Sequence, residues 1–383
     1  MTGKNTQRSP DVVVIGGGVI GLSIAWRAAE AGLSVTLYED SPGRGASWAA
    51  AGLLAPVTEV HHGEERVLRL GVESLKRYPD FIAALEGVTG MRAGYRGTGT
   101  LIAAPDADSY AALGELWRLQ DRLGLDVQPL GRRAARELEP ALTPRLRGAW
   151  LVGGDHAIDN RALATALTEA CRRRGVDLVD AAVSSVVVVS DRARGVTLRD
   201  GPGVDCGAVV IAAGCWSALI EGIPDDVRPP VRPVKGQLIY LQGASRPAII
   251  ERAIRGVDVY LVPRGDGRIV VGATVEERGF DTTVTAEAVY TLLRHALELV
   301  PGLSELELVE CVAGLRPGSP DNVPMIGATG IDGLLVATGH YRNGILLTPL
   351  TADAIAQLLT TGRPPDVIAP ASPQRFQTVK ALP

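Results

Sequence analysis

Residues 12–21 read Val-Val-Val-Ile-Gly-Gly-Gly-Val-Ile-Gly, and this stretch decides the fold of the chain. Val12 to Ile15 is a continuous apolar run, which is typical of a parallel strand with both faces covered. Apolar residues from Val19 to Ala31 recur with helical spacing, and Gly32 predicts the end of that helix. A second apolar run follows at Val35 to Tyr38. The sequence therefore predicts a strand, a glycine turn, a helix and a second strand.

The glycines of this turn have separate physical roles in binding a dinucleotide. Gly16 permits the tight turn after the strand, Gly18 lets the backbone approach a pyrophosphate, and Gly21 lets the helix pack close to the sheet. The helix N-terminus offers free N–H groups and a positive dipole to phosphates. Glu39, at the end of the second apolar run, is placed to accept hydrogen bonds from ribose hydroxyls. This pattern favours a dinucleotide but does not distinguish NAD from FAD.

Length and patterning predict an α/β protein of two domains. The chain has 383 residues, more than one domain usually holds. Between residues 229 and 310, short strands alternate with turns, which predicts a mostly antiparallel sheet inserted into the first domain. We expect a Rossmann-like, doubly wound FAD-binding or NAD-binding domain at 10–90, 150–226 and 311–370, and a substrate-binding domain at 91–149 and 227–310.

Periodicity also predicts the other main elements. Helices are expected at about 65–86, 109–123, 162–174 and 350–359. Strands of the first domain are expected at 183–189, 195–198, 209–212 and 334–337. Strands of the second domain are expected at 100–103, 237–241, 259–262 and 269–271.

Composition and charge argue against several classes of protein. The chain carries 39 basic and 43 acidic side chains with no basic half, so a nucleic-acid partner is not expected. No stretch reaches the roughly 18 apolar residues that a membrane-spanning helix needs, so no membrane partner is expected either. The four cysteines form no Cys-x-x-Cys pair, which predicts reduced thiols in a cytoplasmic protein without a metal site.

Seven further segments carry a second pattern, at 44–53 (Arg-Gly-Ala-Ser-Trp-Ala-Ala-Ala-Gly-Leu), 213–217, 233–237, 260–264, 271–274, 314–318 and 339–346. Together with the glycine turn they resemble the D-amino-acid oxidase family of flavoproteins, in order and over nearly the whole chain. The resemblance implies FAD as a non-covalent cofactor. It also implies FAD-dependent oxidative deamination of glycine and related small amines, including sarcosine and small D-amino acids.

The resemblance assigns particular residues to FAD. The phosphates and ribose fall to Val19, Ile20, Glu39, Asp40, Ala46 and Ser47, the flavin ring to Ala51, Gly52 and Leu53, and the adenine side to the backbone of Val183. The segment His340, Tyr341, Arg342, Asn343, Gly344, Ile345 and Leu346 is expected to close over the pyrimidine end of the ring, and Gly214 lies in another matching segment. Small side chains at 49–52 would leave room for a flat ring, although tight helix packing would favour them too.

Arg316, Arg342 and Tyr260 are the candidate catalytic residues. Arg316 lies in Gly-Leu-Arg-Pro-Gly, and a guanidinium there is suited to binding a carboxylate in a bidentate manner. The alternative is an ion pair with a structural acid such as Asp321 or Asp332. The resemblance places a carboxylate-binding arginine at both arginine positions. The phenol of Tyr260 would donate to the same carboxylate, and the alternative for it is an ordinary strand aromatic.

The family's chemistry is hydride transfer from the substrate α-carbon to FAD. It gives an imine, which is hydrolysed to glyoxylate and ammonia or used in thiamine thiazole synthesis, and dioxygen becomes hydrogen peroxide. The chain departs from the family at Asp258, where histidine is common, and at Val275, where methionine is common. These departures leave the substrate preference open. Two alternatives remain, a sarcosine or D-amino-acid dehydrogenase with another electron acceptor and a non-catalytic flavin-bound subunit, and a homo-oligomer is expected.

Two other features each allow two interpretations. His61, His62, Glu64 and Glu65 are potential metal ligands, but their position in one polar, glycine-containing loop favours a lid over the flavin entrance. Cys311 lies near a position at which some members of the family attach flavin covalently. Because the spacing does not match, we expect Cys311 to be a core residue.

Overall fold

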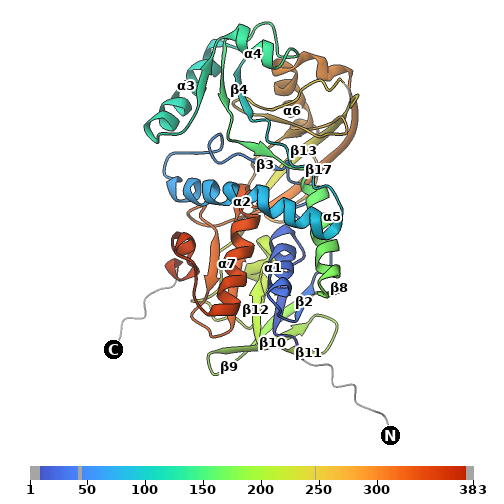
Figure 1. Cartoon of the computed structure of the whole chain (residues 1–383), viewed down its shortest axis with the longest axis vertical. Helices are drawn as coiled ribbons and strands as arrows, with labels where there is room; N and C mark the ends of the chain where they lie inside the picture. Colours follow the sequence, from blue (N-terminus) through green and yellow to red (C-terminus); the bar gives the residue numbers. More distant parts are fainter. Residues whose placement is uncertain (1–8, 42–44, 246, 377–383) are drawn as a thin grey trace.

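The computed structural model describes residues 9–41, 45–245 and 247–376. Its elements form two regions, one above the other along the long axis of the molecule (Figure 1). Helix α2 (Glu65–Thr89) lies across the middle of that view. Its bounds confirm the helix that the sequence predicts at about residues 65–86.

A six-stranded sheet forms the centre of the lower region. Its order is β18 (Met325–Ala328), β19 (Leu334–Thr338), β12 (Ala208–Ile211), β1 (Val12–Ile15), β2 (Val35–Tyr38) and β8 (Asp177–Val179). All neighbouring strands are parallel except β18 and β19. From the central β1, the chain adds β2 and β8 on one side and β12 and β19 on the other. This order confirms the doubly wound sheet that residues 12–21 predict.

Different layers cover the two faces of this sheet. The helices of one face are α1 (Val19–Glu30), α5 (Asn160–Arg173) and α7 (Thr348–Thr361), and the other face carries a small antiparallel sheet of β9 (Val183–Val189), β10 (Arg192–Leu198) and β11 (Gly203–Asp205). On β1, Val12 and Val14 pack against the helices, whereas Val13 and Ile15 pack against the small sheet. Burial of both faces explains why β1 is a continuous apolar run.

An eight-stranded sheet forms the upper region. Its order is β17 (Glu307–Gly318), β13 (Arg232–Gln242), β16 (Arg268–Gly272), β15 (Tyr260–Pro263), β14 (Ala253–Arg255), β4 (Thr100–Ala104), β6 (Gly148–Val152) and β5 (Gln128–Leu130). Among these neighbouring pairs β14–β4 is parallel and the others are antiparallel, which confirms the mostly antiparallel sheet. The expected domain bounds at 150 and 311 fall inside β6 and β17, and the division into domains stays a prediction.

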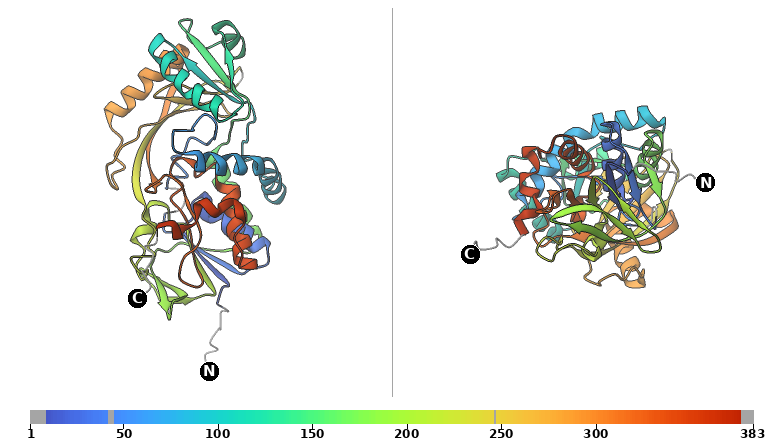
Figure 2. Two further views of the ribbon diagram at one scale, coloured as in Figure 1. Left: turned by 90° about the vertical axis from the view of Figure 1, so that its left-hand side faces the viewer. Right: turned by 90° about the horizontal axis from the view of Figure 1, so that it is seen from below.

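Three helices flank the upper sheet, α3 (Ala107–Arg122), α4 (Arg132–Leu138) and α6 (Ala286–Leu299). On β4, Leu101 packs with the core under α6 and Ile102 with the core under α3, so these two helices lie on opposite faces (Figures 1 and 2). Helix α6 lies where the sequence predicts only strands and turns. Thr285 caps it by accepting a hydrogen bond from the N–H of Ala288.

The strands of the upper sheet also reach the region below. On β13, Ile239 packs on the side of α6, whereas Tyr240 packs against Ala49 and Ala51 of the small-residue segment. A short ladder of β3 (Leu53–Leu54) and β7 (His156–Ala157) joins the same segment to the chain that follows β6. The upper sheet therefore lies against the segment that the resemblance assigns to the flavin ring.

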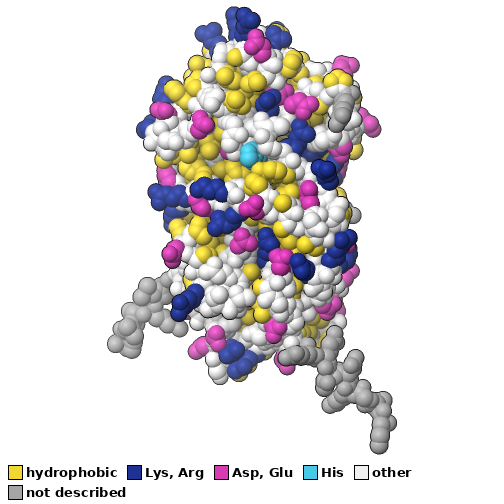
Figure 3. All heavy atoms as spheres, viewed as in Figure 1, with side chains coloured by type: hydrophobic (Ala, Val, Ile, Leu, Met, Phe, Trp, Pro, Cys, Tyr) yellow, Lys and Arg dark blue, Asp and Glu magenta, His cyan; other side chains and the backbone are white. Residues whose placement is uncertain are grey.

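The surface carries charges of both signs. On the face shown in Figure 3, lysine and arginine side chains are interspersed with aspartate and glutamate. Among the described residues, no helix is both long enough and apolar enough to cross a membrane.

Candidate cofactor and substrate site

A cavity of about 1600 Å³ is lined by residues of both regions. This volume exceeds the roughly 300–1,000 Å³ typical of a pocket for one small molecule. The predicted cofactor residues that line it are Gly16, Gly18, Val19, Ile20, Glu39, Asp40, Ala46, Ser47, Ala51, Gly52, Leu53, Val183, Gly214, His340, Tyr341, Arg342, Asn343, Gly344 and Ile345. The cavity has room for a dinucleotide together with a small second ligand.

Two of the turn glycines are required by close contacts. Gly16 has a φ of +110°, and a Cβ there would lie 2.5 Å from the carbonyl oxygen of Ala212. Gly21 does not line the cavity, and a Cβ on it would lie 1.9 Å from the carbonyl oxygen of Gly16. This is the close packing of helix on strand that the spacing predicts for Gly21.

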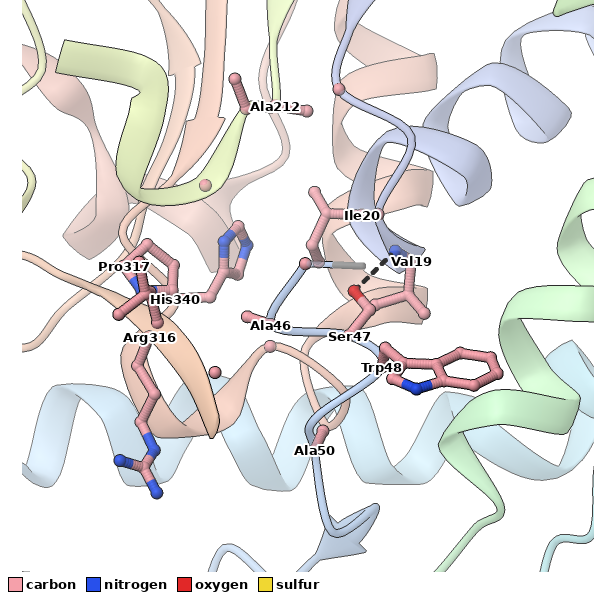
Figure 4. A pocket seen from close by; sticks show the side chains of 18 of the residues that line it. Val19, Ile20, Ala46, Ser47, Trp48, Ala50, Ala212, Arg316, Pro317 and His340 are labelled. Carbon is pink, nitrogen blue, oxygen red and sulfur yellow. Dashed lines mark hydrogen bonds between the residues drawn. The ribbon is translucent and has the colours of Figure 1, made fainter. Parts of the chain in front are cut away.

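Side chains fix the backbone at the N-terminus of α1. The carboxylate of Glu39 accepts hydrogen bonds from the N–H groups of Gly17 (2.6 Å) and Ser41 (2.9 Å). The hydroxyl oxygen of Ser47 accepts from the N–H of Val19 at 3.0 Å (Figure 4). Because the dipole of α1 favours negative charge at this point, this end of the cavity is suited to phosphate.

A buried arginine braces the small-residue segment. The guanidinium of Arg264 donates to the carbonyl oxygens of Ala51 (2.9 Å) and Ile158 (3.0 Å) and to the side-chain oxygen of Asn160 (2.8 Å). Gly52 has a φ of +71°, and a Cβ on it would lie 2.0 Å from the carbonyl oxygen of Ile158. Sequence reasoning did not single out Arg264, although an arginine that directly follows an apolar strand is the signal that points to it.

Arg316 and Tyr260 lie together on the upper sheet. The guanidinium of Arg316 lies over Gly236, where a Cβ would approach it to 2.2 Å, and the ring of Tyr260 lies over Gly272, where a Cβ would approach it to 2.5 Å. Arg316 donates to the carbonyl oxygen of Thr274 at 3.0 Å. Glycines on β13 and β16 thus provide the space that both side chains occupy.

Arg316 lies near the carboxylate of Glu59 but has no acid of the described ranges within ion-pair distance. Among the described residues Arg316 forms no ion pair, and its hydrogen bonds go to backbone carbonyl oxygens. Asp321 pairs with Arg375 at 3.0 Å and Asp332 with Arg192 at 3.2 Å, so neither acid pairs with Arg316. Figure 4 shows Arg316 across the cavity from Val19 and Ser47.

Arg342, in contrast, already has partners. It lies in the short helix η3 (Tyr341–Asn343) and forms an ion pair with Glu64 at 2.7 Å. It also contacts Nε2 of His61 at 2.6 Å, and Glu64 accepts a hydrogen bond from Asn322 at 2.8 Å. The loop in which a lid is predicted therefore contacts the closing segment through Arg342. In the described part of the chain, no group of three or more His, Cys, Asp or Glu is placed to hold a metal ion.

Glu59 and Arg255 also line the cavity, and sequence reasoning singled out neither. Oε1 of Glu59 lies 3.5 Å from Nε of Arg255, whose guanidinium lies 5.8 Å from the ring centroid of Tyr260. Burial alone would raise the pKa of Glu59, but Arg255, Arg342 and His61 lower it below its usual value. Glu59 is therefore an ionised carboxylate. The only sequence signal for either residue is a charge that follows an apolar run.

Four of the predicted closing residues are buried, namely His340, Asn343, Ile345 and Leu346. His340 donates to or accepts from the hydroxyl of Thr351 at 3.0 Å, and burial lowers its pKa to about 3, so the ring is neutral near pH 7. Leu346 does not line the cavity; it packs in the core, and its carbonyl oxygen accepts from the hydroxyl of Ser74 at 2.6 Å.

The remaining residues bear on flavin attachment and specificity. Cys311 lies opposite Ile239 in the β13–β17 ladder and packs against the core on the side of α6. None of the described residues that line the cavity is a cysteine.

Asp258 and Val275, where the chain departs from the family, do line the cavity and so are placed to influence which ligand enters.

Comparison with known proteins agrees with this geometry. The family described as FAD dependent oxidoreductase, DAO, matches residues 11–358. A glycine oxidase from Pseudomonas aeruginosa is 36% identical, over 95% of this chain and 98% of that protein. The crystal structure of glycine oxidase from Geobacillus kaustophilus has a TM-score of 0.87 and 32% identity, over 97% of this chain and 99% of that one. The bifunctional protein ThiO/ThiG of Synechocystis is 35% identical over 97% of this chain, which spans only 55% of that relative.

Proposed function

This chain belongs to the DAO family of FAD-dependent oxidoreductases, and we propose that it catalyses the oxidative deamination of glycine and related small amines. The observation that carries the proposal is the guanidinium of Arg316, which lines the cavity beside Tyr260 without an acidic partner among the described residues. The likeness to glycine oxidases over nearly the full length of both chains supports the choice of substrate.

The residues present fit FAD. Gly16, Gly52 and Gly314 line the cavity, and a Cβ on any of them would come within 2.5 Å of a neighbouring protein atom, so glycine lets the segments that wall the cavity pack closely behind a flat ligand. We assign the phosphates to the end formed by Val19 and Ser47 and the ring to the segment 51–53. When bound, FAD would supply the chemistry of hydride acceptance from the substrate α-carbon. We expect dioxygen to take up the two electrons together with two protons, which gives hydrogen peroxide.

We assign the substrate carboxylate to Arg316 and Tyr260. The guanidinium is a fork that matches a carboxylate, and the phenol adds a donor from the neighbouring part of the sheet. The positive charge of Arg316 lowers the pKa of a nearby substrate ammonium, which favours the neutral amine that the reaction requires. Because the carboxylate is fixed, the α-carbon is fixed as well, and positioning contributes most of the catalysis.

Arg342 is the second candidate for the carboxylate. Its ion pair with Glu64 means that it binds a substrate only by sharing or exchanging that partner. We therefore place it after Arg316 in importance for substrate binding.

We further propose a cytoplasmic homo-oligomer with dioxygen as its electron acceptor. Its four free thiols support a reducing compartment. We propose that the imine is hydrolysed to glyoxylate and ammonia or passed to thiazole synthesis, and the likeness to one half of a ThiO/ThiG protein supports the second fate.

An anaerobic titration of the purified holoprotein with glycine tests the proposal. We expect glycine to bleach the blue absorption band of the flavin, and air to restore it with release of hydrogen peroxide. Bleaching by sarcosine, D-alanine or D-proline but not by glycine would assign a different amine. Reoxidation by a dye but not by air would assign a dehydrogenase, and no bleaching by any of these amines would contradict the proposal.

A further inference from the structure

We propose that Glu59 binds the amino group of the substrate, opposite the carboxylate site formed by Arg316 and Tyr260. This inference rests on the proposed function, because that function supplies an α-amino acid as the ligand. It adds a residue that selects for the amine, whereas Arg316 and Tyr260 select for the carboxylate.

The first observation is an unsatisfied acceptor in the wall of the cavity. The side chain of Glu59 is 15% exposed, and its Oε1 is buried with no hydrogen-bond donor among the described residues. Nε of Arg255 lies 3.5 Å from this oxygen but does not form a hydrogen bond with it. An unsatisfied carboxylate oxygen is costly, and because Glu59 lines the cavity with a partly exposed side chain, a ligand N–H in the cavity approaches this carboxylate.

The second observation is that the turn carrying Glu59 is held in place. The N–H groups of Val57 (3.1 Å) and Thr58 (2.7 Å) both donate to the carboxylate of Asp155, and the hydroxyl of Thr58 donates to it as well. Asp155 is completely buried. Glu59 is therefore presented to the cavity from a fixed backbone, as a binding group requires.

The third observation is the balance of charge around Glu59. The groups that face it come from several elements, namely Arg255 of β14, Arg316 of β17, Arg342 of η3, Tyr260 of β15, His61 of the same loop, and Asp155. Arg342 is paired with Glu64, and Arg255 lies beside Glu59. One guanidinium, that of Arg316, is left for a carboxylate. A ligand with a single carboxylate and an amine satisfies both Arg316 and Glu59.

The proximity of Arg255 also suits the chemistry of an amine oxidase. An isolated carboxylate would stabilise the substrate ammonium and so oppose its deprotonation. Because Arg255 offsets part of the charge of Glu59, the carboxylate accepts a hydrogen bond from the amine without holding its proton strongly. The site therefore selects primary and secondary amines, which keep an N–H after deprotonation, and disfavours N,N-dimethylglycine, which does not.

The experiment compares two ligands in the holoenzyme variants Glu59→Gln and Glu59→Asp. Glycine carries both groups, and acetate carries the carboxylate alone. The dissociation constant of glycine is measured by anaerobic rapid mixing, or by calorimetry where no reduction occurs, and that of acetate by calorimetry. We expect glycine to bind at least tenfold more weakly to Glu59→Gln, and acetate to bind within twofold of wild type or more tightly. Glu59→Asp should weaken glycine by a smaller factor.

The matched control is Glu310→Gln, which also removes a glutamate from a pair with an arginine. Glu310 pairs with Arg161 at 2.8 Å, lies on the same strand as Arg316, and does not line the cavity. We expect it to bind both ligands as wild type does.

Several outcomes would overturn the assignment of Glu59. Unchanged glycine binding in Glu59→Gln would do so, and so would an equal weakening of glycine and acetate binding. Loss of FAD from both Glu59 variants would show instead that the residue is structural. Failure of the proposed function looks different, because wild-type flavin would then not be reduced by any small amine. The two binding constants would still decide the role of Glu59 in that case.

Discussion

The two ends of the cavity are built in different ways. The end suited to phosphate comes mainly from one stretch of chain, in which Glu39 and Ser47 accept hydrogen bonds from Gly17 and Val19, and Gly16 also lies close to Ala212, which follows β12. The end assigned to the substrate takes its charged groups from a loop, two strands and a short helix that are far apart in the sequence. The first end depends on backbone geometry, and the second depends on a balance of charges across distant elements.

This difference predicts how each end responds to substitution. A clash in the first end should disrupt the sheet and the cofactor together, because the same glycines serve both. A change in the second end should alter the ligand and leave FAD bound, because the surrounding sheet holds the backbone.

The largest effect is expected for Gly21→Val. Since even a Cβ at this position would lie 1.9 Å from the carbonyl oxygen of Gly16, the helix must move away from the sheet. We expect loss of FAD and failure to fold, measured by bound flavin and by thermal unfolding. Gly114→Ala, in α3 with open space around it, is the control and should fold and bind FAD. A stable yellow Gly21→Val protein would show that the close packing is not required.

Arg316→Ala should show the next largest effect, confined to the substrate end. We expect the free energy of substrate binding to weaken by about 3 kcal/mol, within the range for stranding one partner of a desolvated charge pair. Bound FAD should be unchanged, and Arg192→Ala, which removes a surface pair with Asp332, serves as the control. Loss of flavin from Arg316→Ala would instead assign Arg316 to the structure of the sheet.

A smaller effect is expected for Tyr260→Phe, which removes one donor to the carboxylate. A hydrogen bond to a charged group contributes about 1.5 kcal/mol or more, so kcat/KM for glycine should fall roughly tenfold. Steady-state kinetics of the holoenzyme measures this. An unaltered kcat/KM would identify Tyr260 as an ordinary strand aromatic.

An effect of a different kind, on the pH dependence of stability, is expected from Asp155, which anchors the turn of Glu59. Burial raises the pKa of Asp155 to about 7, although hydrogen bonds from Thr58 and Val57 oppose the rise. The folded protein therefore keeps a proton that the unfolded chain loses near its ordinary value of 3.8. The free energy of unfolding should then fall as pH rises from about 4 to about 7, by at most about 1.4 kcal/mol per pH unit.

Denaturant unfolding of the holoprotein across that range measures the contribution of Asp155. Asp155→Asn should flatten the slope, whereas Asp332→Asn, at an exposed surface pair, should not. Equal slopes for wild type and Asp155→Asn would show that this carboxyl group does not titrate between the two values.

The elements of the fold were predicted where local patterning is strong. The apolar runs at β1, β2, β9 and β12 and the periodic helices α1, α2, α5 and α7 are all present. Helix α6 was not predicted, because its region is dominated by turns and short strands and its cap at Thr285 was not recognised. Strands β9 and β10 were predicted, but their place as a separate layer on the parallel sheet follows from packing against β1.

By itself, the sequence determined the glycine turn, the strands and helices of the sheet that follows from it, and the likeness to a flavoprotein family, because each of these is recorded in short local motifs of the chain. Tertiary structure alone decided that Arg342 is paired with Glu64, that Arg316 has no acidic partner among the described residues, and that Glu59 lies among three arginines. Those facts depend on which distant elements meet at the cavity. The charged residues of these elements are far apart in the sequence. Their spacing along the chain therefore gives no pattern from which the balance of charge between them could be predicted.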